Sequence, residues 1–427
     1  MQQKKSESIW VGIMHMGLGT VLAQMINIIA QPILTRVFPA ETLGIYTYLI
    51  SLATMIIPVA SLKLDMLIVS ESDDEEAQYI TDACVVVNIL VSILYAIVIL
   101  IGYKFSKNNI FSKYGKIIYI VPVLVFTNGL RFLFISYLNR YKQYKTISII
   151  AIIREAIRAV IQLGAGFLSM GTLALSMGYA VSPLFGLNIQ MKDYLKKKKD
   201  RPRLNTEKFK DIVFNKGRRQ ILFLLPAQFI NSFSSSFVTI SITALFSASV
   251  LGYYSAGVRL LEIPIIFITA NVSKVCYQRV SECVSEQKKV LNTVLSVMTV
   301  LSAVSVAGFG LLYFIAPKLS EIVFGNGYGI AGEYIRCLCV MYAVRLVATS
   351  FLGLYTVFQK QNFELILNIL LIVSAGLSYA ICKTLECDVI IYLKCMNIGY
   401  SMVYLLMLIG YIVVCGRYDR KIRSVNK

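Results

Sequence analysis

Charge and histidine are both scarce in this sequence. Charged residues make up 15% of its 427 positions, against roughly 25% in an average soluble domain. The single histidine, His15, stands in an apolar segment, so catalysis or metal binding by histidine has little to build on. We interpret His15 as a packing residue, and we expect a membrane protein rather than a soluble one.

Cysteine motifs and nucleotide-binding loops are missing as well. The nine cysteines are scattered, mostly within apolar runs, and the close pair Cys337 and Cys339 has no further Cys or His at zinc-ligand spacing. We interpret the cysteines as small apolar packing residues and expect no metal site. The glycines from Gly325 to Gly329 lack the Lys-Ser or Lys-Thr that completes a Walker loop. We interpret them as a flexible turn.

Long apolar runs are what the sequence has in abundance. Hydrophobic residues make up 57% of the chain, and the mean hydropathy is +0.69. Because the runs are long and do not alternate, helices are favoured over a closed barrel. The sequence predicts an all-α membrane protein with about twelve spans of about 17 to 25 residues each. The spans fall near 9–34, 43–69, 80–102, 117–138, 147–168, 172–191, 219–245, 251–273, 290–314, 333–358, 363–382 and 389–415.

The distribution of lysine and arginine predicts the orientation. With both termini inside, about 27 of these residues fall in inside loops and about seven in outside loops. The net charge of +19 therefore indicates topology and not a nucleic-acid-binding surface. One inside loop, Glu71 to Glu76, is acidic, but acidic residues weigh little in this rule. We predict an N-in, C-in protein.

The longest polar stretch predicts a division into two lobes. Segment 192–218 contains a run of four lysines, Lys196 to Lys199, and separates a six-helix lobe 1–191 from a six-helix lobe 219–427. As a basic linker it either grips anionic lipid or a cytoplasmic partner, or is simply solvated beside anionic headgroups. We favour the solvated reading.

An internal repeat supports this division. Five residues return after 208 positions, and an even number of spans separates the two copies. Thr35, Phe38, Leu43, Gly44 and Tyr46 return as Thr243, Phe246, Leu251, Gly252 and Tyr254. The two halves would then share one orientation, as in many secondary transporters, and we expect the cavity to lie between them.

Basic residues inside the spans are the candidate site. Each costs about 2.5 to 3.5 kcal/mol at the middle of a bilayer, so such residues must face protein, water or substrate. Five stand deep in the predicted spans: Lys63, Arg131, Arg154, Arg158 and Arg345.

Arg154 and Arg158 are the strongest candidates. Four residues apart on a helix, they share a face on which like charges repel unless an anion lies between or beside them. The alternative is that Glu155, three residues before Arg158, neutralises it in a structural pair. Arg131 can add a third guanidinium, a group whose fork suits phosphate geometry.

The remaining charged residues have more open roles. Lys63 either lines the cavity or extends its amine to the inner surface. Arg345 has no acidic residue within a helical turn, which makes it the candidate in the second half. Arg259 and Glu262 are three apart, and we predict a structural pair. Asp65 either carries a coupling proton or sodium ion or pairs with a nearby cation.

Five stretches spread over both halves carry a recognisable family pattern. They are LTRVFPAETLGIYTYLIS (34–51), LKLDMLIVSESDDEEA (62–77), YLNRYKQYKTISI (137–149), LPAQFINSFSSSFVTISITALFSASVLGYYSAGVRLLEIPI (225–265) and VFGNGYGIAGEYIR (323–336). In combination they resemble the oligosaccharide-lipid flippases of Wzx type, within the multidrug/oligosaccharidyl-lipid/polysaccharide exporter superfamily.

The resemblance implies a carrier and not an enzyme. Such a protein moves an undecaprenyl-diphosphate-linked oligosaccharide across the bacterial inner membrane by alternating access, for O-antigen and lipopolysaccharide, capsule or exopolysaccharide synthesis. The diphosphate would contact Arg131, Arg154, Arg158, Arg345 and Lys63. No cofactor is implied, but a proton or sodium gradient would drive transport, with a coupling role for Asp65 or Glu155. Membrane lipids, a polysaccharide polymerase and a chain-length regulator are implied partners, and nucleic acid is not.

Three alternatives compete with this interpretation. A cation-coupled drug or metabolite antiporter of the same superfamily is expected to have an acidic cavity, whereas the deep residues here are mainly basic. A membrane-embedded polysaccharide polymerase or ligase needs a large outer loop, and the longest one here, 316–332, has about seventeen residues and no acid–base pair. A lipid II flippase of fourteen spans needs two more helices than the sequence supplies.

Overall fold

The structure is a computed structural model that describes residues 9–105, 114–199 and 204–425. Within these ranges every regular element is a helix, and none is a strand. The predicted all-α class is therefore confirmed.

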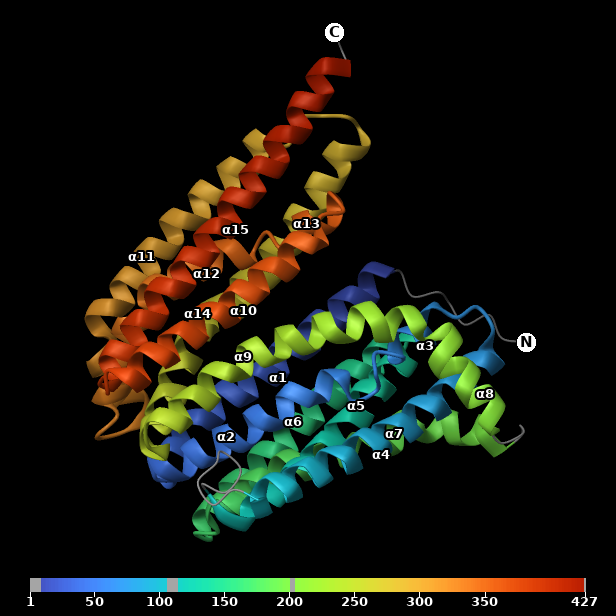
Figure 1. Ribbon diagram of the computed structural model, residues 1–427, viewed down its shortest axis with the longest axis horizontal. Helices are drawn as coiled ribbons and strands as arrows, with labels where there is room; N and C mark the ends of the chain where they lie inside the picture. Colours follow the sequence, from blue (N-terminus) through green and yellow to red (C-terminus); the bar gives the residue numbers. More distant parts are fainter. Residues whose placement is uncertain (1–8, 106–113, 200–203, 426–427) are drawn as a thin grey trace. The chain divides into compact units, whose positions relative to one another are not determined.

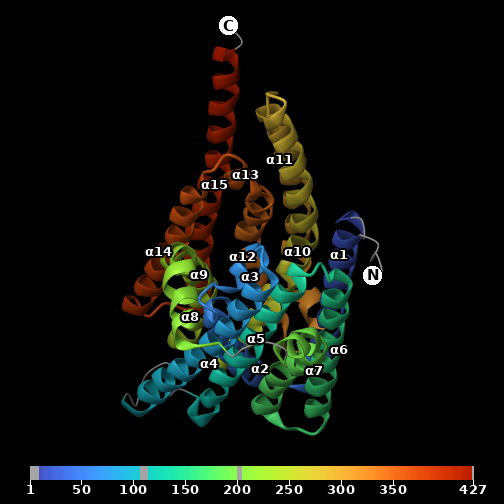
Figure 2. The ribbon, with the colours of Figure 1, turned by 90° about the vertical axis from the view of Figure 1, so that its right-hand side faces the viewer.

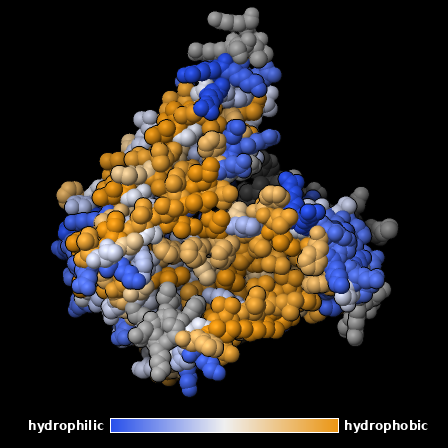
Figure 3. Space-filling view, in the orientation of Figure 1, coloured by the Kyte–Doolittle hydropathy of each residue, from blue (hydrophilic) through white to orange (hydrophobic). Residues whose placement is uncertain are grey.

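Ten of the described helices are long and apolar enough to cross a membrane. They are α2 (Ala40–Ile56), α4 (Asp74–Phe105), α5 (Val121–Arg140), α7 (Gly171–Lys199), α9 (Leu225–Leu245), α10 (Ala248–Ser285), α11 (Leu291–Phe324), α12 (Gly329–Thr349), α14 (Gln361–Thr384) and α15 (Val389–Val425). Two further long helices are α1 (Ile9–Val37) and α6 (Tyr144–Phe167). Figure 3 shows apolar residues over the middle of the visible face and hydrophilic residues gathered towards its edges. The chain is a multi-pass membrane protein.

The chain divides into two compact units, residues 1–243 and 244–427. In the first unit α5 packs against α2, α4 and α7, while α1 packs on α6 and α6 on α7 (Figure 1). An aromatic group lies between α5 and α7 near the C-terminal ends of both helices, with the Tyr194 ring 5.4 Å from that of Phe134 and 5.9 Å from that of Tyr137. All three side chains are buried, so this end of the unit is a packed core.

In the second unit α12 is the central helix and contacts α10, α11 and α15. α14 lies alongside α15 in both views (Figures 1 and 2), and the short α13 (Gly353–Val357) packs on α10. A Cβ atom at Gly332 would lie 2.3 Å from Cα of Pro317. Backbone therefore meets backbone where α12 crosses α11.

The start of α11 is held by the end of α15. The Asp419 carboxylate accepts hydrogen bonds from the backbone N–H groups of Val290 (2.9 Å) and Leu291 (3.2 Å). The first N–H groups of a helix have no partner within it, so a side chain from another helix here acts as the cap.

The predicted span 43–69 is not one continuous helix. α2 ends at Ile56, a 3₁₀ turn follows at Ile57–Val59, and α3 (Asp65–Ser70) begins after a break. At the break Leu62 and Lys63 have φ angles of 51° and 61°, a region that bulky residues rarely adopt. Lys63 and Asp65 therefore stand at an interruption of the helix.

The described part of the predicted linker is folded onto the first unit. Asn205 caps α8 (Thr206–Lys210), and π-helical turns follow at Asp211–Lys216 and Gln220–Leu224. The side chains of Ile212 and Val213 are buried in the core formed by α3, α4, α5 and α7. These residues are therefore packed and not freely solvated.

Candidate functional site

Three ionisable residues of α6 form an ion triad. Glu155 is buried, and its Oε1 lies 2.5 Å from Nη2 of Arg154. Its Oε2 pairs with Nη2 of Arg158. The side chains of Arg154 and Arg158 are 20% and 15% exposed. Glu155 is thus the shared counter-ion of both arginines, and a role of the arginines in binding stays a prediction.

Arg131 of α5 joins this group from the neighbouring helix. Its guanidinium lies within electrostatic range of Arg154, Glu155 and Arg158, and 4.1 Å from the centroid of the Phe132 ring. The structure therefore brings together three of the five basic residues that the sequence singles out. We call Arg131, Arg154, Glu155 and Arg158 the arginine cluster.

The arginine cluster has more donors than acceptors. Three guanidiniums and one carboxylate leave a formal charge of +2, and each guanidinium offers five N–H donors. In the described part of the chain, Nε of Arg131 and Nε of Arg154 are buried and have no hydrogen-bond partner. Buried donors of this kind are costly unless they are satisfied. An anion with several oxygens would satisfy them.

Sequence reasoning missed an aromatic neighbour of the cluster. The Arg158 guanidinium lies 5.8 Å from the centroid of the Tyr179 ring on α7. A cation over a ring face is stabilised electrostatically. No pattern in the sequence indicates this contact, because it depends on the packing of α6 against α7.

Lys63 and Asp65 lie elsewhere in the first unit, at the break before α3. The Asp65 carboxylate accepts hydrogen bonds from the Ser61 hydroxyl (2.5 Å) and the Ser136 hydroxyl (3.3 Å). Both Lys63 and Asp65 are partly exposed. Two hydroxyls therefore satisfy the carboxylate, and its proposed coupling role stays a prediction.

Arg345 has an acidic neighbour that the sequence does not reveal. Its Nη1 lies 3.7 Å from Oε1 of Glu262, which stands on α10. The Arg345 guanidinium also lies 5.1 Å from the centroid of the Tyr342 ring. Arg345 and Glu262 meet because α10 packs against α12. The predicted pairing of Glu262 with Arg259 stays a prediction.

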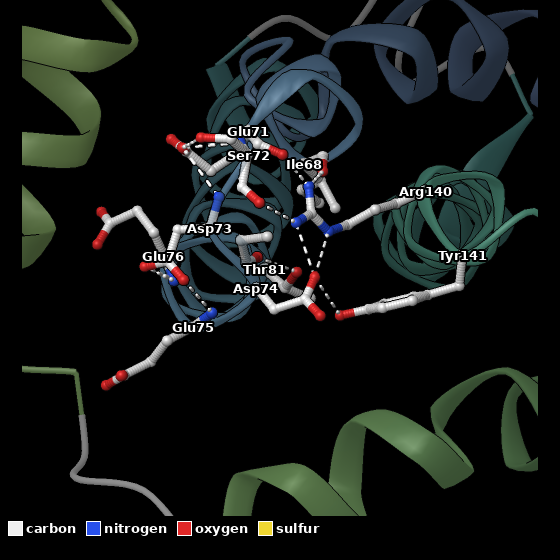
Figure 4. Close-up of polar contacts among 11 residues, drawn as sticks. Ile68, Glu71, Ser72, Asp73, Asp74, Glu75, Glu76, Thr81, Arg140 and Tyr141 are labelled. Carbon is white, nitrogen blue, oxygen red and sulfur yellow. Dashed lines mark hydrogen bonds and ion pairs between the residues drawn. The ribbon is translucent and has the colours of Figure 1, made fainter. Parts of the chain in front are cut away.

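The acidic loop of the first unit is built around Arg140 (Figure 4). Arg140 stands at the end of α5 and donates hydrogen bonds to the carbonyls of Ile68 (3.1 Å) and Glu71 and to the Asp74 carboxylate (2.7 Å). Asp73 accepts hydrogen bonds from the first N–H groups of α4. Two carboxylates of the loop therefore have structural roles: Asp73 caps the start of α4, and Asp74 receives the guanidinium that caps the end of α3.

Lysines of the folded linker close the other side of this loop. Lys208 and Lys216 lie 3.0 Å and 2.9 Å from the carboxylate oxygens of Glu76, and Lys216 lies 3.8 Å from Glu71. The hydrogen bond to Glu76 raises the pKa of the Lys216 amine above its ordinary value. The signal in the sequence was the presence of one acidic loop and one strongly basic segment that are both predicted to lie on the inside.

Comparison with known proteins agrees with this architecture. A family model described as polysaccharide biosynthesis protein matches residues 10–331. The chain is similar to the lipid II flippase MurJ in an inward closed conformation, with a TM-score of 0.75 and 11% identity over 96% of this chain and 90% of that chain. None of the curated proteins compared with the chain matches it.

Two further solved structures share the fold. An inward-facing multidrug resistance transporter of the MATE family, in the MOP superfamily, has a TM-score of 0.67 and 10% identity over 96% of this chain and 99% of that chain. A MOP-superfamily transporter from Pyrococcus furiosus has a TM-score of 0.61 and 13% identity over 97% and 95%. The predicted family resemblance is confirmed: the chain belongs to the polysaccharide biosynthesis protein family and has the fold of the MOP-superfamily transporters.

Proposed function

We propose that this protein is a flippase that carries undecaprenyl-diphosphate-linked oligosaccharide repeat units across the bacterial inner membrane. The repeat units would serve O-antigen, capsule or exopolysaccharide synthesis. One observation carries the proposal: three guanidiniums from α5 and α6 lie around a single carboxylate, that of Glu155, in a protein from a polysaccharide biosynthesis family. The likeness to a lipid II flippase supports a lipid-linked cargo.

The chemistry of a diphosphate matches the arginine cluster. A diphosphate carries more than one negative charge and several acceptor oxygens, and guanidinium forks bind such oxygens in pairs. The formal charge of +2 left over by Glu155 is of the right sign and size. Arg131 is the residue on which we place most weight, because its buried Nε has no hydrogen-bond partner in the described part of the chain.

The proposed transport cycle uses the rest of the predicted site. In this proposal α1 and α6 join the ten apolar helices as spans, in two halves with both termini inside. The lipid tail stays in the bilayer while the head moves by alternating access. Arg345 and Lys63 contact the head at other stages, and a proton or sodium gradient acts through Asp65 or Glu155.

A vesicle assay with an Arg131 variant tests the proposal. The probe is a fluorescent polyprenyl-diphosphate disaccharide, and flipping is read as protection of the dye from a membrane-impermeant reductant. Losing a charge-assisted contact costs roughly 1.5 to 3 kcal/mol, and 1.4 kcal/mol is a factor of ten. We expect Arg131→Gln to slow flipping at least tenfold and Arg131→Lys to slow it less.

Two controls separate binding from folding. Arg279→Gln removes an arginine whose side chain is 62% exposed and paired with Glu282 on its own helix, so flipping should stay at the level of the unaltered protein. A lipid-linked disaccharide without phosphate should be insensitive to Arg131→Gln. If Arg131→Gln flips the diphosphate probe at the unaltered rate while its thermal unfolding is normal, the proposed site is wrong.

A further inference from the structure

Three of the nine cysteines gather where α14 turns into α15. Cys382 stands in the last turn of α14, Cys387 in the connecting loop and Cys395 in the second turn of α15. The thiols of Cys387 and Cys395 both lie within electrostatic range of the Cys382 thiol. α14 and α15 run side by side (Figures 1 and 2), which brings the third thiol to the other two.

The backbone holds the first two thiols together. The N–H of Cys387 donates a hydrogen bond to the carbonyl of Cys382 (3.1 Å), and Glu386 between them has a φ angle of 47°. This is the helix-ending motif in which the residue three positions before the helix end meets the second residue beyond it, side chain against side chain. Such a contact is ordinarily hydrophobic, and here both residues are cysteine. The backbone of this turn therefore brings the two cysteines together.

Exposure assigns different roles to the three thiols. Cys382 is only 2% exposed, whereas Cys387 and Cys395 are partly exposed. An oxidant can reach Cys387 or Cys395 directly, and Cys382 only after one of them has reacted. A metal is not the explanation that the geometry favours, because no group of three or more ligands suited to a metal ion occurs in the described part of the chain.

We propose that these residues form a thiol–disulfide site in which Cys382 forms a disulfide with Cys387. By thiol–disulfide exchange, Cys395 can replace Cys387 as the partner of Cys382. The first disulfide locks the end of α14. The second ties α14 to α15. The site is separate from the arginine cluster, which lies in the other unit.

The chemistry balances with a disulfide donor as oxidant. The Cys387 thiolate attacks one sulfur of the donor, forms a mixed disulfide and releases one donor thiol. The Cys382 thiolate then attacks the Cys387 sulfur and releases the second donor thiol. The two cysteines lose two electrons and two protons, and the donor disulfide gains them as two thiols. When Cys395 attacks Cys382, Cys387 leaves as a thiol and no net oxidation occurs.

The orientation predicted from lysine and arginine gives the site its oxidant. In that orientation the α14–α15 loop, with Lys383, lies outside the cytoplasm. Disulfides form and persist in such compartments, where dedicated oxidoreductases supply the donor. The proposed pairing itself does not depend on orientation, because it follows from the local geometry of one helical hairpin.

Peptide mapping tests the pairing directly. Trypsin cleavage after Lys360, Lys383, Lys394 and Arg417 would place the three cysteines on separate peptides, 361–383, 384–394 and 395–417. The other six cysteines, Cys84, Cys276, Cys283, Cys337, Cys339 and Cys415, are replaced by serine or alanine. After treatment with oxidised glutathione we expect peptide 361–383 linked to 384–394, with a minor link to 395–417. Denatured protein should bind one maleimide before reduction and three after it.

Variants identify the order of attack. In Cys382→Ser, Cys387 should keep a bound glutathione, because the thiol that resolves the mixed disulfide is gone. In Cys387→Ser, peptide 361–383 should link to 395–417 instead. A matched control keeps only Cys337 and Cys339, which lie two apart on α12 and point to different faces, and should form no disulfide within the chain.

Two outcomes would overturn the proposal. The first is that maleimide finds three reactive thiols both before and after treatment with oxidised glutathione, in protein whose thermal unfolding matches that of the unaltered chain. The other is a distribution of linked peptides no different from that of the fully denatured protein, which would show that the fold does not select the pair. Neither outcome bears on flipping, so failure here leaves the proposed transport function untouched.

Discussion

Replacing Arg140 by alanine should destabilise the first unit at its acidic loop, Glu71 to Glu76. The Arg140 side chain is only 9% exposed, and it donates hydrogen bonds to the carbonyls of Ile68 and Glu71 as well as to Asp74. The two carbonyls belong to the end of α3, where the helix supplies no donor of its own. In Arg140→Ala these two carbonyls lose their charged hydrogen-bond donor, and this loss is the main cost of the substitution.

The expected magnitude follows from these contacts. Hydrogen bonds to a charged group contribute roughly 1.5 to 3 kcal/mol each when desolvated, and the partly exposed setting lowers this figure. The Asp74 side chain is 63% exposed, so its ion pair adds at most about 1 kcal/mol. We therefore expect Arg140→Ala to lower the free energy of unfolding by about 2 to 4 kcal/mol.

Equilibrium unfolding in mixed detergent micelles, followed by far-UV circular dichroism, measures this difference. Asp74→Asn removes only the exposed ion pair and should cost less than about 1 kcal/mol. Arg140→Lys keeps the charge but lacks the fork that reaches two carbonyls and a carboxylate together, so its cost should lie between the two. The reasoning is refuted if Arg140→Ala costs no more than Asp74→Asn.

Two further predictions concern packing and pH. Gly332→Ala should destabilise the second unit by roughly 1 to 3 kcal/mol, because its Cβ would meet the backbone of Pro317, whereas Gly308→Ala, with open space around its Cβ, should be neutral or stabilising in thermal unfolding. Lys216 loses its interaction with Glu76 when its amine deprotonates. Because its pKa is raised in the folded state, the interaction is complete below the ordinary lysine value of about 10.4 and is lost as pH rises through the raised value. In the unaltered protein, a spin label on α8 should become mobile in that alkaline range. In Lys216→Gln the label should already be mobile at neutral pH. Unchanged mobility in both experiments would contradict the assigned interaction between Lys216 and Glu76.

Much of the fold follows from local sequence patterns, and the interruptions do not. Span lengths are encoded in continuous apolar runs, which is why the all-α class is predictable. The break after α2 depends on two bulky residues, Leu62 and Lys63, in a left-handed conformation. The neighbouring Leu64 is fully buried, and its Cδ2 lies 2.3 Å from where a Cβ at Gly217 would stand. A partner some 150 residues away along the chain therefore helps to hold the break, and no local pattern contains that contact.

The candidate site shows the same division between local and distant contacts. Arg158 and Glu155 are three apart on one helix, so their pairing is open to sequence reasoning. Arg131 approaches them only because α5 packs beside α6, and Arg345 meets Glu262 only because α12 packs on α10. The rule that an ionisable residue in a span needs a partner predicts that Arg345 meets an acidic residue from another helix. The rule does not identify Glu262 as that residue.

The acidic loop marks the limit of charge counting. The positive-inside rule treats this loop as an exception of little weight. Charge counting alone gives no reason for five carboxylates within the six residues from Glu71 to Glu76. In the structure Asp73 caps α4, Arg140 caps α3, and lysines of the linker cover Glu76. The Asp73 cap is local to the start of α4, whereas the contacts of Arg140 and of the linker lysines need a distant element to be in place.

The carboxylate of Asp419 makes the final turns of the chain matter for anyone who tags or trims it. An appended tag after Val425 leaves this side chain in position, but a protein cut short before residue 419 would free two amide groups at the head of a 34-residue helix. Tyr418 next to it donates a hydrogen bond to the carbonyl of Val284, so a cut before residue 418 also loosens the end of α10. Such a shortened protein would be expected to insert into the membrane and still fray at one edge, a defect that expression level alone would not reveal.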